Sequence, residues 1–161
     1  MVTYAATDII PMRSFVYQWR ITDAQWNALS NELLAHIVPL TPERSEQIGH
    51  QGRAFRQEQL PPKSTTYYQI VSQCSLAPIN SADNENIQRW FQKLPIKHKE
   101  TVYVNWGDNV AIVTEWHTFT NVWFSLWYPF DAVEVFDDTL SWAALFGPEE
   151  IATFIMKRSL R

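Results

Sequence analysis

Glu115 and His117 are the residues whose types and spacing are best suited to acid–base chemistry. On a strand, positions i and i+2 share one face, so the carboxylate could orient the imidazole as a general base. The same pair could equally form a polar contact on the solvent face of a sheet. Asp131 is a third candidate: a hydrolase would hold Glu115, His117 and Asp131 in or near one cleft, and the sequence leaves enzymatic activity uncertain.

Four acidic residues of the C-terminal third fall near the ends of expected strands: Asp131, Glu134, Asp137 and Asp138. A glycosidase needs two carboxylates roughly 5–10 Å apart, and neighbouring Trp side chains would supply stacking platforms for sugar rings. Paired acids are also common in turns, and a Trp in a strand more often belongs to the core. A carbohydrate-active or other hydrolytic enzyme is therefore the alternative hypothesis, and a binding protein is the leading one.

Signatures of phosphate-binding loops, nucleophile elbows and zinc sites are missing from the sequence. The chain has only 4 glycines and no G-x-G-x-x-G, Walker or G-x-S-x-G pattern. Its 4 histidines lack zinc-binding spacing, and the single cysteine, Cys74, cannot build a Cys-rich metal cage. We therefore predict no metal, no cofactor and a reducing, cytoplasmic compartment.

The net charge of -4 is unevenly distributed along the chain. Residues 101–156 contain eight Asp or Glu and no Lys or Arg, and twelve of the 23 aromatic residues lie between positions 101 and 146. Such a surface repels phosphate backbones, which predicts no nucleic-acid partner, and fits a basic protein partner. The alternative is an acidic face that only keeps the protein soluble. No apolar run reaches about 18 residues, so no membrane span is expected.

Three helices are expected in the N-terminal part of the chain, each with a cap and a stop. The first follows Thr22 and ends before Pro39, and the second begins at Thr41-Pro42 and ends at Gly49. Residues 50–64 contain Gly and Pro among polar residues and are expected to form a loop, and the pattern around 67–71 fits neither template. The third helix begins at Ser81 or Asp83 and ends at Pro95.

From residue 100 the apolar residues alternate, which predicts strands. The expected strands are 102–106, 110–116, 122–128, 133–136 and, as a fifth, 140–146, with a hairpin turn at 107–109 and a final helix after Gly147. This order indicates a single α+β domain spanning residues 1–161. Its architecture would be N-terminal helices, an antiparallel meander of four or five strands in the C-terminal half, and a C-terminal helix.

The strand expected at 122–128 carries large aromatic side chains on both faces. Trp123 and Trp127 share one face with Ser125, and the opposite face is also apolar. If helices cover one face only, the other keeps an exposed aromatic patch rimmed by acids, as in a protein-binding surface. The alternative is a central strand buried on both faces. The predicted binding residues are Trp123, Trp127, Asp131, Glu134, Asp137 and Asp138.

The C-terminal segment also carries a resemblance. Tyr103-Val-Asn-Trp-Gly, Trp123-Phe-Ser-Leu-Trp-Tyr-Pro, the acids at 131–138 and Leu145-Phe-Gly-Pro-Glu-Glu are similar to small single-domain bacterial proteins grouped only as uncharacterised families, some of which look like immunity proteins. The likeness covers about the last 60 residues and implies a bacterial, non-enzymatic binder. We therefore predict a soluble protein-binding domain that neutralises a cationic toxin; a homodimer formed through the aromatic face is a further possibility.

Overall fold

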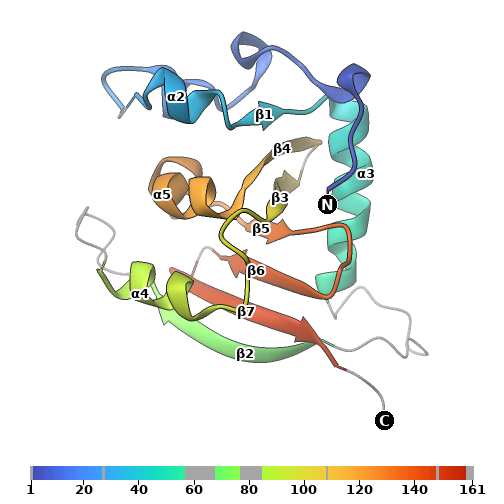
Figure 1. The fold of residues 1–161 in the computed structure, drawn as a ribbon, viewed down its shortest axis with the longest axis vertical. Helices are drawn as coiled ribbons and strands as arrows, with labels where there is room; N and C mark the ends of the chain where they lie inside the picture. The colour runs from blue at the N-terminus through green and yellow to red at the C-terminus, as the bar shows by residue number, and fades with distance from the viewer. Residues whose placement is uncertain are drawn as a thin grey trace.

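The computed structural model describes residues 2–26, 28–56, 68–76, 85–107, 109–147 and 149–158. They form an α+β fold around a seven-stranded sheet whose neighbouring strands are all antiparallel, in the order β1-β4-β3-β5-β6-β7-β2 (Figure 1). The mixed helix and sheet class is confirmed, but the expected four or five strands were too few. The strands are β1 (Val38–Pro39), β2 (Tyr68–Ser75), β3 (Thr101–Gly107), β4 (Val110–Glu115), β5 (Val133–Phe136), β6 (Trp142–Phe146) and β7 (Ile151–Lys157).

The hairpin expected at 107–109 joins β3 to β4. Gly107 and Asn109 adopt φ angles of 75° and 61°, a left-handed conformation that glycine and asparagine accept most readily. The expected strands at 133–136 and 140–146 are present as β5 and β6. The ambiguous segment near 67–71 forms β2, which pairs with β7 at the far edge of the sheet.

The expected strand at 122–128 is wrong, because this segment belongs to helix α5 (Trp116–Leu126) and the turn that follows it. Nearly every side chain here is apolar, so a strand period and a helix period cannot be distinguished. In the helix, Trp116, Phe119 and Trp123 lie three and four positions apart and are buried in the core between α5 and the sheet.

The expected C-terminal helix is also wrong, because the segment after Gly147 forms strand β7. Ile151, Phe154 and Ile155 fit a helical spacing as well as an extended one. The strand is selected by its neighbours: β7 is hydrogen-bonded to β6 on one side and to β2 on the other. Pairing with a strand on each side satisfies the backbone polar groups of β7. The sequence of the β7 segment alone does not show that these neighbouring strands exist.

The first two helices expected in the N-terminal part have different outcomes. Where a helix was expected between Thr22 and Pro39, the described residues contain the single helical turn Asn31–Leu34, preceded by another turn that ends at Thr22. The helix expected at Thr41 is present and continues to Gly52, and the Thr41 hydroxyl accepts a hydrogen bond from the Arg44 backbone N–H. The caps proposed at Ser81 and Asp83 and most of the expected loop lie outside the described residues. The helices are α1 (Trp19–Thr22), α2 (Asn31–Leu34), α3 (Pro42–Gly52), α4 (Glu85–Lys93) and α5, with 3-10 turns η1 (Ala6–Asp8), η2 (Met12–Ser14) and η3 (Arg53–Phe55).

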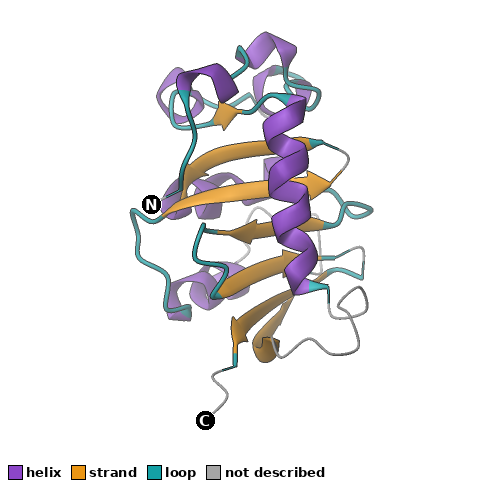
Figure 2. Cartoon of the chain, turned by 90° about the vertical axis from the view of Figure 1, so that its right-hand side faces the viewer, coloured by secondary structure: helices purple, strands orange, loops and turns teal. Residues whose placement is uncertain are grey.

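Helices cover both faces of the sheet. Figure 2 shows α3 crossing one face of the strands, with α4 and α5 behind them. Alternate residues of β3 divide between the two cores: Val102 and Val104 join the α4–α5 side, and Tyr103 joins the α3 side. The expectation that one aromatic sheet face stays uncovered is therefore wrong. No helix within the described ranges is long and apolar enough to cross a membrane.

Candidate functional site

Trp123 and Trp127, the two aromatic residues expected to anchor a partner, lie in the core. Their side chains are only 4% and 2% exposed, and their rings pack against each other at 6.1 Å between centroids. Trp123 also contacts Phe91 of α4 and Phe146 of β6. Both residues belong to the layer between α5 and the sheet, so they stabilise the fold and are not available to a partner.

The four acids expected to form a binding face each have partners within the protein. Asp131 forms an ion pair with Arg20, and Glu134 forms one with Arg56. Asp137 accepts hydrogen bonds from the backbone N–H and hydroxyl of Thr139, as a turn-forming Asp does. These contacts make the three carboxylates structural rather than free charges on one surface.

Asp138 completes a polar contact with the N-terminal segment. One of its oxygens accepts a hydrogen bond from the Tyr103 hydroxyl at 2.8 Å, and the other accepts one from the Thr3 backbone N–H. Burial and the hydrogen bond to Asp138 raise the pKa of Tyr103 well above its usual range. Arg44 donates to the same hydroxyl oxygen. Asp138 therefore serves to fasten the N-terminus to β3.

The structure brings together two of the three residues considered for catalysis. His117 Nδ1 lies 3.1 Å from a Glu115 oxygen, and its ring stacks on His98 at 4.6 Å. Glu115 and His117 stand at the start of α5, whereas Asp131 follows the end of that helix and pairs with Arg20. The three therefore do not form one cleft. Within the described residues, no group of three or more His, Cys, Asp or Glu is arranged to hold a metal ion.

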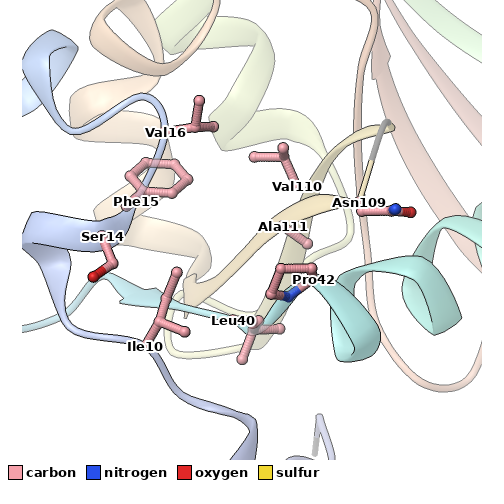
Figure 3. Close-up of a pocket in the computed structure, with 9 residues that line it drawn as sticks. All are labelled: Ile10, Ser14, Phe15, Val16, Leu40, Pro42, Asn109, Val110 and Ala111. Carbon is pink, nitrogen blue, oxygen red and sulfur yellow. The ribbon is translucent and has the colours of Figure 1, made fainter.

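An apolar pocket of about 340 Å³ lies between the N-terminal segment and the start of β4. Figure 3 shows Phe15, Leu40 and Val110 around it, with Asn109 at its rim. Ser14 and Asn109 are the polar side chains among its described lining residues, so the pocket offers no charged group for acid–base chemistry.

A different set of aromatic residues is exposed. Trp19 of α1 packs edge-to-face on Trp26 and on Tyr128, with ring centroids 5.5 and 5.6 Å apart. Trp26 is 55% exposed, and Phe130, two residues after Tyr128, is 94% exposed. We call Trp19, Trp26, Tyr128 and Phe130 the aromatic cluster. It joins the N-terminal helical turns to the turn after α5.

A buried cation supports the aromatic cluster. The Arg20 guanidinium lies between the rings of Tyr17 and Tyr128, at 4.0 and 4.1 Å from their centroids. It also forms the ion pair with Asp131, whose carboxylate accepts the Tyr128 backbone N–H as well. Cation–π contacts and a charged hydrogen bond thus fix Tyr128 in place.

Sequence reasoning missed most of this cluster. Trp19 and Trp26 were not among the predicted binding residues, and Trp26 lies in the segment between Thr22 and Pro39 where a single helix was expected. Asp131 is the predicted binding residue that does lie beside the cluster. A usable signal was Tyr128-Pro129-Phe130-Asp131, because a turn sequence leaves a large apolar side chain without a core position.

Comparisons with protein-family models, with curated proteins and with solved structures find no match for this chain. The function is therefore argued from the residues of the site.

Proposed function

We propose that the protein is a non-enzymatic protein-binding domain that contacts its partner through the aromatic cluster. The observation that carries this proposal is the exposure of Trp26 and Phe130 beside the partly exposed Trp19. Water-exposed aromatic groups of this size cost free energy that a partner recovers by covering them. Trp and Tyr are also the residue types most enriched among binding hot spots.

The rigidity of the support favours binding as well. Tyr128 is held by Arg20, and Trp19 is held between Trp26 and Tyr128. Side chains that are already ordered lose little conformational entropy when a partner binds. The cluster therefore has preorganised anchors, and the exposed Phe130 follows Tyr128 by two residues.

The ring geometry favours a protein over a sugar chain. Trp19 meets Trp26 at an interplanar angle of 74° and Tyr128 at 83°. A platform for consecutive sugar rings would present aromatic faces side by side, whereas here the edge of one ring meets the face of the next. An interlocked surface of this kind suits side chains that insert between the rings.

The partner class favoured by the sequence is a cationic toxin, which the protein would neutralise as an immunity protein. The charge of residues 101–156 supports this form of the proposal. Because Arg20 neutralises Asp131 next to the cluster, steering by that acid is weak and binding would depend mainly on apolar contact. The expected salt dependence of association is correspondingly small.

The partner can be identified by placing a photo-crosslinking amino acid at position 130 in the organism that carries the gene. Ile70 is the matched control, because it is an exposed apolar residue (63%) on edge strand β2. We expect one protein to be crosslinked from position 130 and not from position 70. Crosslinking to a second copy of the chain would instead identify a homodimer, which light scattering would verify.

The purified partner then tests the surface itself. Trp26→Ala and Phe130→Ala should each weaken binding by about tenfold or more, since truncating a hot spot costs about 2 kcal/mol. Ile70→Ala should leave the affinity unchanged. Wild-type affinity in both cluster variants would show that the partner binds elsewhere.

A further inference from the structure

A polar cavity of about 450 Å³ lies between α3 with η3 and the β3–β4 hairpin. His50, Arg53 and Arg56 line its helical wall, and Asn105 and Trp106 line the wall formed by β3. The aromatic cluster contributes none of these residues. The cavity therefore calls for a separate explanation of what it holds.

The spacing of the basic residues explains why they share this wall. His50, Arg53 and Arg56 lie three positions apart: the first in the last turn of α3, the second at the start of the 3-10 turn η3, and the third directly after that turn. In a 3-10 turn, residues i and i+3 project from the same side, and the Arg56 backbone N–H bonds to the Arg53 carbonyl at 3.1 Å. The two guanidinium groups are thus placed on one side of the cavity.

Arg56 is oriented by a buried carboxylate. Its Nε–H donates to Glu134 Oε1 at 2.8 Å, while the Asn105 side-chain amide donates to Glu134 Oε2 at 3.0 Å. The Glu134 side chain is 7% exposed, but that of Arg56 is 45% exposed. Across the described ranges, the terminal nitrogens of Arg56 have no hydrogen-bond partner. The carboxylate therefore holds one edge of the guanidinium and leaves its outer donors open to a ligand.

Arg53 provides the second charge. It forms no ion pair with any residue that the structure describes, in contrast to Arg20, Arg44 and Arg89. Glu46, the acidic residue of the same wall, lies 4.0 Å from His50. Among the described residues, therefore, no carboxylate forms an ion pair with Arg53 at the cavity wall.

We propose that this cavity binds the oxyanion group of a small polar molecule, a carboxylate or a phosphate, between Arg53 and the outer donors of Arg56. Guanidinium groups bind such oxyanions through paired N–H donors, which matches the two arginines available. Asn105 is a positioning residue, because its amide is already occupied by Glu134 and by the Gly107 backbone N–H. The C-terminal end of α3 carries a partial negative charge that disfavours an anion. Binding therefore requires the positive charges of both arginines.

Inorganic phosphate and acetate are the probes, titrated at constant ionic strength with chloride as the reference anion. The readout is the NMR shift of the Trp106 indole and arginine Nε–H signals of the full chain. We expect at least one probe to give saturable shifts. Arg53→Gln should weaken that binding by about tenfold or more, and Arg89→Gln, which removes the same charge from exposed helix α4, should leave it unchanged.

Testing whether Arg56 binds the anion requires a variant that lacks its charge and still folds. Arg56→Gln alone leaves Glu134 buried without its cation, so Arg56→Gln combined with Glu134→Gln removes both charges together. This double variant should remain folded by thermal unfolding and should also lose saturable binding. Non-saturable shifts with both probes, or equal affinity in Arg53→Gln and Arg89→Gln, would overturn the proposal. Saturation by only one probe would identify whether the site takes carboxylates or phosphates.

Discussion

Arg20 and Asp131 form an ion pair that connects positions 111 residues apart in the sequence. Arg20 belongs to the short helix α1, and Asp131 closes the turn after α5. Their side chains are only 7% and 18% exposed. The pair is therefore largely shielded from water and fastens the N-terminal segment to the rest of the fold.

Asp131→Asn should destabilise the protein by about 3 kcal/mol, because it leaves the buried Arg20 cation without its counter-charge. Urea unfolding followed by circular dichroism would measure the change. Glu85→Gln is the control, since it breaks the exposed Arg89–Glu85 pair and should cost about 0.5 kcal/mol. Similar costs for the two variants would contradict the structural role given to Arg20 and Asp131.

Trp123→Ala and Trp26→Ala should differ in their effect on the free energy of unfolding, because the first residue is in the core and the second is on the surface. The first removes a buried ring and leaves a cavity, so the free energy of unfolding should fall by about 3–5 kcal/mol. The second truncates a half-exposed ring, and its effect should be below about 1 kcal/mol. Denaturant unfolding of both variants provides the comparison, and the opposite order would place Trp123 outside the core.

Glu134 should make stability depend on pH. Burial raises the pKa of Glu134 above its ordinary value of 4.5, and the opposing effects of Arg56 and Asn105 are smaller. Because the folded-state pKa is the higher one, the stability contributed by this group is fully present below about pH 4.5 and is lost as pH rises through the folded pKa. Wild-type stability should therefore fall relative to Glu134→Gln over that window.

Urea unfolding of both proteins from about pH 4 to about pH 8 measures this difference. Glu85→Gln again serves as the control, since it removes an exposed carboxylate. A stability gap between wild type and Glu134→Gln that stays constant with pH would show that Glu134 titrates normally.

Two glycines of α3 should respond oppositely to alanine. A Cβ at Gly52 would clash with Glu134 Oε2, so Gly52→Ala must displace the buried carboxylate and should cost about 1–3 kcal/mol. At Gly49 the nearest atom would be 4.0 Å away, so Gly49→Ala should gain about 0.5–1 kcal/mol of helix propensity. Thermal unfolding of the two variants tests the pair, and stabilisation by both would mean that Glu134 has room to move.

The sequence predicted best the elements that depend on local signals. The β3–β4 hairpin follows from turn residues between alternating strands, and α3 from a Thr41 cap with Pro42 in its first turn. It failed for α5 and β7, whose apolar patterns fit two periods at once. The secondary structure of these two segments depends on their packing against the rest of the sheet. It cannot be predicted from the sequence of either segment alone.

The candidate site was less predictable than the fold for the same reason. Trp19 and Tyr128 are far apart in the sequence, and their contact lies beside the equally long-range pair of Arg20 and Asp131. The acids appeared as a free charged face because their partners, among them Arg56 for Glu134, lie in other elements. Composition reports which residue types are present, whereas pairing between distant segments decides which of them reach the surface.

The assembly of the aromatic cluster from two distant segments means that it is a discontinuous epitope. A peptide containing either segment alone would lack half of the contact surface, and an unfolded chain would lack all of it. A partner that recognises the cluster must therefore bind only the native state, and it would raise the melting temperature as its concentration increases. Binding would then require a folded chain. A newly made chain would bind its partner only after its N-terminal segment had packed against the turn after α5.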